Sequence, residues 1–302
     1  MEVAMKIVEV GPRDGLQNEK QVISTEDKLA YIELLIGAGH KRIEAVSFAR
    51  PDRVPQMADA EAVMSGVQRI DGVSYIGLVM NERGLDRALA TKVDEANIVI
   101  VATETFSNRN QNMTIAESLK GLEAMVSRAK AEGLQVTTTI GASFGCPFEG
   151  EVATSQVTSI AKAATEMGVD EIAIADTIGV GTPKDVRRIV TAVKEVTSLP
   201  LRLHLHNTRN TGYANAFAGY EAGVISFDSS SGGIGGCPFA PAATGNIATE
   251  DLTYLFERSG IEVGLDFARL TEAAQFITEK LGIVTPALLV RAGWFPAPEH
   301  TH

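Results

Sequence analysis

Residues 201–207 read L-R-L-H-L-H-N, from Leu201 to Asn207, and alternate apolar with polar side chains along their whole length. This period of two is typical of a β-strand, whose successive side chains point to opposite faces. Three leucines should therefore face one way, while Arg202, His204 and His206 face the other. The two imidazoles can be hydrogen-bonded groups of a core or ligands of one ion. We favour metal binding, because a buried pair of imidazoles is costly without a ligand.

The same strand belongs to a regular alternation of strands and helices. Short apolar runs occupy Ile7–Val10, Arg42–Phe48, Ser74–Met80, Ala96–Val101, Gln135–Ala142, Glu171–Asp176, Leu201–His206 and Val224–Asp228. Amphipathic stretches follow at Thr25–Gly39, Ala58–Val67, Glu82–Ala90, Ile115–Glu132, Gln156–Met167, Pro183–Val196, Gly212–Ala222 and Thr249–Ser259. Strict alternation predicts an α/β fold with parallel strands, and this number of units predicts a (β/α)8 barrel. A doubly wound sheet is the rival, but G-P-R-D-G-L-Q is not its Gly-rich phosphate turn.

The pattern predicts a single catalytic barrel domain over 1–302. The barrel should span about 5–265, a C-terminal helical cap with a helix at Phe267–Leu281 should span 266–295, and a flexible tail should span 296–302. The formal net charge of −11 argues against a nucleic-acid partner, since such surfaces are basic. No signal peptide or apolar run of about 20 residues is evident, so we expect no membrane partner and a cytoplasmic protein.

Polar groups are expected to gather where the strands end, because barrel active sites lie at the C-terminal ends of strands. Asp14 follows the first strand, the two histidines end the seventh, and Asn246 follows the eighth. A mixed nitrogen and oxygen set of this kind suits Mg²⁺ or Mn²⁺ with open positions. A hydroxy acid could fill those positions, and cleavage of its C–C bond would leave an enolate for Arg13 to stabilise.

Three further side chains are candidates for the chemistry. Cys237 lies in a loop with four glycines, a poor place to bury a thiol, so we predict a catalytic role for it; Cys146 should be structural. The pattern of its strand predicts that Asp176 points into the barrel mouth as a functional group or as a partner that orients a histidine. Glu44 is either functional in the same way or paired with an inward arginine such as Arg202.

Several motifs resemble those of the 3-hydroxy-3-methylglutaryl-CoA lyase family. They are V-E-V-G-P-R-D-G-L-Q-N-E at Val8–Glu19, E-A-V-S-F from Glu44, G-C-P-F-E-G from Gly145, D-T-I-G-V-G-T-P from Asp176, and G-G-C-P-F-A and T-G-N-I-A-T-E-D between Gly235 and Asp251. The resemblance implies a (β/α)8 barrel that uses Mg²⁺ or Mn²⁺ to cleave an acyl-CoA into acetyl-CoA and acetoacetate. Relatives form dimers, so a homodimer is implied as well.

Carried over by position, the resemblance assigns a role to each candidate. The metal ligands would be Asp14, His204, His206 and Asn246. The catalytic group would comprise Arg13 for the enolate, Cys237 as its acid, His204, and the central polar partners Glu44 and Asp176. Asn110, in the segment after the fourth strand, would contact the CoA.

One stretch departs from the family. After the histidines the family reads Asp-Thr-Tyr-Gly, whereas this chain reads Asn207-Thr208-Arg209-Asn210. The added arginine could pair with a carboxylate of another 3-hydroxyacyl-CoA or point to solvent. A sister lyase is therefore the first alternative, and a condensing acyltransferase of the isopropylmalate or homocitrate synthase type is the second. A metal-dependent hydrolase and a barrel that only binds a ligand are weaker alternatives.

Overall fold

The computed structural model describes residues 5–236 and 245–297. Within these ranges, parallel strands close into one barrel in the order β1 to β8, with β8 paired to β1. The strands are β1 (Lys6–Glu9), β2 (Arg42–Ser47), β3 (Ser74–Val79), β4 (Glu95–Val101), β5 (Gln135–Gly141), β6 (Glu171–Asp176), β7 (Leu201–Leu205) and β8 (Ser226–Ser229). The predicted (β/α)8 barrel is confirmed, and the strands agree with the sequence within two residues at their starts and ends.

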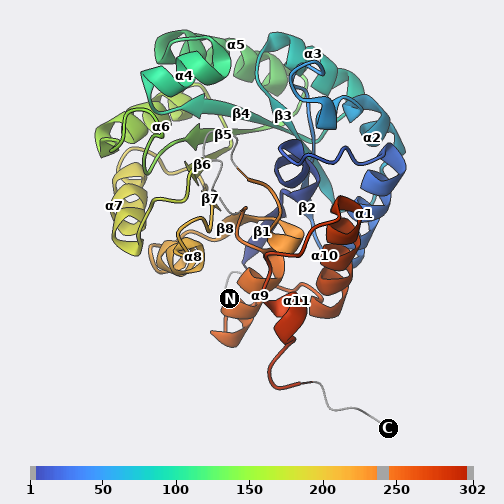
Figure 1. The fold of residues 1–302 in the computed structure, drawn as a ribbon. Coiled ribbons are helices and arrows are strands. Elements are labelled where there is room, and N and C mark those ends of the chain that lie inside the picture. The colour runs from blue at the N-terminus through green and yellow to red at the C-terminus, as the bar shows by residue number, and fades with distance from the viewer. Residues whose placement is uncertain (1–4, 237–244, 298–302) are drawn as a thin grey trace.

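Helices surround the barrel (Figure 1). They are α1 (Thr25–Gly37), α2 (Ala60–Gly66), α3 (Glu82–Thr91), α4 (Glu104–Gln111), α5 (Ile115–Ala131), α6 (Thr154–Glu166), α7 (Pro183–Lys194), α8 (Gly212–Glu221), α9 (Thr249–Arg258), α10 (Phe267–Leu281) and α11 (Leu289–Ala292), with short turns η1 (Gly11–Gly15), η2 (Pro55–Met57) and η3 (Ser231–Gly233). The predicted C-terminal helix is α10, which lies beside α1 (Figure 1) and is tied to it by the Lys280–Asp27 ion pair at 2.7 Å. None of the described helices is long and apolar enough to cross a bilayer.

Local signals explain where several helices begin. The Ser24 side chain accepts a hydrogen bond from the Asp27 amide at the start of α1. Thr114 and Glu117 form a reciprocal capping box at the start of α5. Helix α4 was not predicted: its eight residues have low hydrophobicity, so their sequence looks like a loop, and the helix lies between β4 and α5 over the barrel mouth.

The space inside the strands is mostly polar, unlike the branched apolar filling that is usual in such barrels. Val8, Val10 and Ile76 form a small apolar cluster separate from the main core, which lies between strands and helices. Charged side chains occupy much of the remaining interior and bond across it, as Arg42 of β2 does to Glu171 of β6. These polar side chains lead directly to the groups at the C-terminal ends of the strands.

Candidate active site

The predicted metal ligands meet at the C-terminal end of the barrel. Asp14 lies in η1 directly after β1, and His204 lies near the end of β7, two residues before His206. One side-chain atom from each of the three lies within 4.8 Å of the others. The two Nε2 atoms are 3.1 Å apart, and His204 Nε2 is 3.8 Å from Asp14 Oδ2. The cluster follows from the sequence, because strand alternation sets the direction of each side chain and the strand ends set its position.

Asn246 completes the set. Its backbone pairs with that of His206, and its Nδ2 donates to Asp14 Oδ2 at 2.9 Å. Its Oδ1 is buried without a hydrogen-bond partner among the described residues. A buried oxygen of this kind usually has a partner, so an ion at this place would satisfy it. Neighbouring ligands of an octahedral ion with bonds of about 2.1 Å lie about 3 Å apart, which is the separation of the two imidazole nitrogens. The residues present therefore fit a hard divalent ion.

Asp228 of β8 sets the direction of the His204 ring. Its Oδ2 lies 3.1 Å from His204 Nδ1, so the ring's other nitrogen faces His206 and Asp14. Burial alone would lower the pKa of His204, but the bond to Asp228 and the charge of Asp14 raise it above its ordinary value. Burial and the neighbouring His204 lower the pKa of His206 to about 4. Such a second carboxylate is the usual support of a metal-bound histidine.

Arg13 is held in place beside the candidate ligands. Its Nε donates to Glu44 Oε2 at 2.6 Å, and its Nη1 donates to Asp14 Oδ1 at 2.6 Å. Glu44 Oε1 accepts from Asn97 Nδ2 at 2.8 Å, and the Thr139 hydroxyl donates to Asn97 Oδ1 at 2.7 Å. The partner of Glu44 is therefore Arg13 and not Arg202. Burial opposes ionisation of Asp14, yet Arg13 and the two imidazoles hold the pKa of that carboxyl below its ordinary value.

The expected direction of Asp176 is wrong. In the β6–β7 register, Ala175 lies opposite His204 and Asp176 lies opposite Leu205, so Asp176 faces away from the barrel axis. Its carboxylate accepts from the amides of Val180 and Gly181, both at 2.9 Å, and thereby shapes the loop that follows β6. The preceding alternation could not reveal this, because both faces of β6 are apolar. The side chains that line the mouth from this segment are Ala175 and Thr177.

A cavity of about 190 Å³ opens over the candidate ligands. It is lined by Arg13, Asp14, Gln17, Asn18, Leu78, Met80, Asn97, Val99, Phe106, Asn110, Thr139, Gly141, Ala175, Thr177, His204, His206, Asp228 and Gly236. A groove of about 720 Å³ beside it shares Asn110 and Gln17 and adds Arg50, Arg53 and Arg109. The sequence analysis assigned no role to three polar residues of the site, Asn97, Thr139 and Asp228. Each is a polar residue within a predicted strand, and that position could have identified it as inward-facing.

The structure describes only one of the two cysteines that the sequence analysis considered. Cys237 lies outside the described residues; Gly236, at the edge of the described part, lines the cavity and accepts from Asn18 Nδ2 at 2.9 Å. Cys146 is buried, and its sulfur accepts from the Thr103 hydroxyl at 3.1 Å, which agrees with a structural role. The predicted catalytic role of Cys237 stays a prediction.

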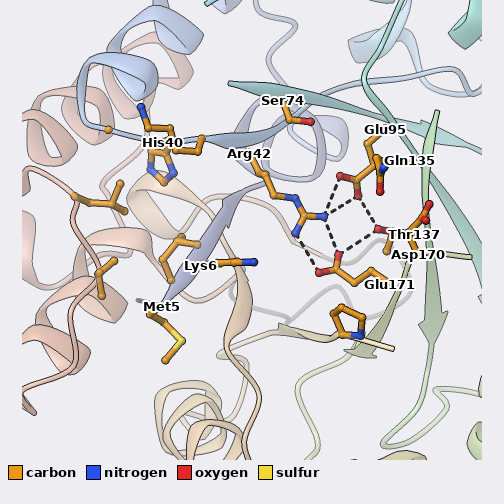
Figure 2. A pocket seen from close by; sticks show the side chains of 16 residues that line it. Met5, Lys6, His40, Arg42, Ser74, Glu95, Gln135, Thr137, Asp170 and Glu171 are labelled. Carbon is orange, nitrogen blue, oxygen red and sulfur yellow. Dashed lines mark hydrogen bonds and ion pairs between the residues drawn. The ribbon is translucent and has the colours of Figure 1, made fainter. Parts of the chain in front are cut away.

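A second cavity, of about 570 Å³, lies at the opposite, N-terminal end of the barrel. Figure 2 shows the Arg42 guanidinium between Glu95 and Glu171, with Thr137 linking the two carboxylates. These groups satisfy one another, and the candidate metal ligands are not among them. The chemistry is therefore assigned to the C-terminal mouth.

The fold is a closed (β/α)8 barrel, and its C-terminal mouth brings together two imidazoles, carboxylates and a buried arginine. These features define a barrel enzyme with a candidate metal centre. Comparison with known proteins specifies it further: residues 4–277 match the HMGL-like family model. The chain belongs to the HMGL-like family and is a carbon–carbon lyase.

Similar proteins include two kinds of lyase. An (R)-citramalyl-CoA lyase from Chloroflexus aurantiacus is 41% identical over 301 residues, covering 96% of this chain and 95% of that one. A cytoplasmic 3-hydroxy-3-methylglutaryl-CoA lyase from Danio rerio is 43% identical, covering 96% and 87%. An HMG-CoA lyase structure from Acinetobacter baumannii in complex with coenzyme A and 3-methylmalate has a TM-score of 0.94 at 39% identity, covering 98% of this chain and 97% of that one.

Proposed function

We propose that the protein is a lyase dependent on Mg²⁺ or Mn²⁺ that cleaves 3-hydroxy-3-methylglutaryl-CoA to acetyl-CoA and acetoacetate. The observation that carries the proposal is the meeting of Asp14, His204, His206 and the orphan oxygen of Asn246 beside Arg13. The similarity to HMG-CoA lyases over nearly the whole chain supports the choice of substrate.

Asp14, His204, His206 and Asn246 would hold the ion. Its charge would lower the pKa of the substrate's 3-hydroxyl. The hydroxyl proton passes to solvent in the open mouth, the electron pair left on the oxygen forms the new carbonyl, and the C2–C3 bond breaks toward the thioester. The leaving electrons then reside on an enolate of acetyl-CoA. Arg13 is the fixed cation at this place, because Glu44 and Asp14 prevent its guanidinium from turning.

The enolate carbon must then receive a proton from an acid, which solvent afterwards reprotonates. We assign this step to the Cys237 thiol, which lies outside the described residues, on the ground of its Gly-rich loop. A Cys237→Ala protein should keep its affinity for Mn²⁺ and lose most of its turnover. Retention of full turnover would contradict the assignment.

The CoA portion should occupy the groove beside the mouth, where Arg50, Arg53 and Arg109 offer positive charge to phosphates. Asn110 lines both this groove and the mouth, which makes it the side chain that we assign to the CoA at the junction. An Asn110→Ala change should raise the KM for acyl-CoA and leave Mn²⁺ affinity unchanged. A changed Mn²⁺ affinity with an unchanged KM would contradict this role.

A second substrate is favoured by one observation, the 41% identity to an (R)-citramalyl-CoA lyase over 301 residues. That acyl-CoA differs from 3-hydroxy-3-methylglutaryl-CoA by one methylene between the carbinol carbon and the carboxylate, and it would give pyruvate in place of acetoacetate. A methylene in a pocket changes specificity by about 10–200-fold. The same chemistry can therefore serve either substrate, and product analysis with both separates them.

The assembly and the location belong to the proposal too. We propose a homodimer, which light scattering of the purified protein would test. A cytoplasmic site of action is supported by the cytoplasmic relative from Danio rerio, whereas other relatives are mitochondrial. Fractionation of source cells would decide between the two locations.

A further inference from the structure

Arg202 lies on the inward face of β7, two residues before His204, and is 1% exposed. Its Nε is 3.3 Å from Asp228 Oδ1 and 3.5 Å from Glu171 Oε2. These contacts are ion pairs and not hydrogen bonds, because Arg202 Nε and Asp228 Oδ1 have no hydrogen-bond partner among the described residues. The other oxygen of Asp228 contacts His204 Nδ1. One buried carboxylate is thus shared between an arginine below and a candidate metal ligand above.

The lower end of this arrangement is fixed independently. Arg42 binds Glu171 through two nitrogens, at 3.1 and 2.8 Å, and binds Glu95 at 2.9 Å. The Thr137 hydroxyl donates to both carboxylates, as Figure 2 shows. Glu171 therefore cannot turn away, and it offers Arg202 a second anion in a constant place. A column of alternating charges joins the N-terminal mouth of the barrel to the candidate metal site.

We propose that Arg202 is a positioning residue for the metal site and acts through Asp228 on His204. The proposal rests on the proposed function, because it takes His204 as a ligand. A buried carboxylate is held in one direction when a positive or hydrogen-bonding group faces each of its oxygens. Arg202 is the cation that faces Asp228 Oδ1, while His204 takes Oδ2. The arginine therefore fixes Asp228, and Asp228 fixes the imidazole that faces the ion.

The proposed role of Arg202 differs from that of a charged residue that only stabilises the barrel interior. Arg42 provides the comparison, since it is also a barrel arginine and contacts the same Glu171, while its described ion pairs are with Glu95 and Glu171. Loss of Arg42 should weaken folding but leave Asp228 and His204 in place, because Thr137 still binds Glu171 and Arg202 still faces Asp228 directly. Loss of Arg202 should weaken folding and also release the imidazole.

The experiment measures Mn²⁺ affinity by calorimetry in the full-length protein without substrate, together with thermal unfolding. Arg202→Met and Arg202→Gln should weaken Mn²⁺ binding about 10–100-fold, the usual effect of losing an orienting partner. Arg202→Lys should restore most of the affinity because it returns the charge. Arg42→Met should lower the Tm while its Kd for Mn²⁺ stays within about threefold of wild type.

Two results would overturn the proposal: wild-type affinity in the Arg202→Gln protein, or an equal loss in Arg42→Met. If Arg202→Met does not fold, the comparison of Arg202→Gln with Arg202→Lys decides the matter. Absence of Mn²⁺ binding by the wild-type protein would instead overturn the proposed function, so the two failures are distinguishable.

Discussion

Replacing Glu44 with glutamine removes the charge that holds Arg13 without much change in shape. Glu44 is 1% exposed and lies between the Arg13 guanidinium and the Asn97 amide. Burial raises the pKa of Glu44, and Arg13 and Asn97 oppose that rise. Glutamine can offer an oxygen to only one of its two neighbours, so one of them must face an NH2 group.

Opening a buried ion pair costs about 3–5 kcal/mol of unfolding free energy. Arg13 keeps Asp14 as a second anion, so we expect a loss of about 3 kcal/mol, near the lower limit. The guanidinium would also lose its fixed direction toward the enolate. Removal of one preorganised group of this kind lowers kcat by about 10²–10³. Mn²⁺ affinity should stay within about threefold, because Glu44 is not a ligand.

Urea unfolding, steady-state kinetics and Mn²⁺ titration of Glu44→Gln test these values. The matched control is Glu95→Gln, which opens a pair with Arg42 at the other end of the barrel and should lower stability while kcat is retained. An unchanged kcat in Glu44→Gln, or an equal fall in the control, would refute the role given to the Glu44–Arg13 pair.

Three further changes test other parts of the structure. Gly235 has φ +99°, and a Cβ there would lie 2.9 Å from Asn246 Nδ2. Because the added methyl would displace the Asn246 amide, Gly235→Ala should weaken Mn²⁺ binding about tenfold in a titration. Arg209 donates to the carbonyls of Ile178 and Gly179 at 2.9 and 3.0 Å, so Arg209→Tyr should cost about 1 kcal/mol in thermal unfolding and leave the preference between the two acyl-CoAs nearly unchanged in kinetics. Burial raises the pKa of the Glu250 carboxyl from 4.5 to about 8. The folded protein therefore binds the proton more tightly than the unfolded chain, and the free energy of unfolding should fall as the pH rises from 4.5 to 8. Glu250→Gln should flatten a plot of Tm against pH over this range.

The seventh strand shows how far the sequence could predict the site. Its strict alternation predicts opposite faces for Leu203 and His204, and the position of His204 at the cavity beside Asp14 confirms the predicted direction. The sixth strand offers no such contrast: Ile174 and Ala175 are both apolar, because the strands of a parallel sheet are buried on both faces. The inward face is the one with alanines, so Asp176 was placed on the wrong side.

The pair of Arg13 with Glu44 joins residues that are far apart in sequence, and its partner could not be read from local patterns. For Glu44 the sequence favoured equally a functional role at the barrel mouth and a salt bridge to an inward arginine such as Arg202. Only the closed barrel shows that Arg202 lies with Asp228 and Glu171. Long-range ion pairs inside a barrel depend on register and strand order, which local alternation does not give.

The most direct test of the metal-dependent lyase follows acetoacetate and pyruvate from 3-hydroxy-3-methylglutaryl-CoA and citramalyl-CoA. The protein would first be stripped with EDTA and then given Mg²⁺ or Mn²⁺, with His206→Ala as the variant lacking a ligand. We predict acetoacetate from the first acyl-CoA only after metal is restored, and none from His206→Ala. Equal turnover without metal, or no cleavage of either acyl-CoA by metal-loaded protein, would contradict the account.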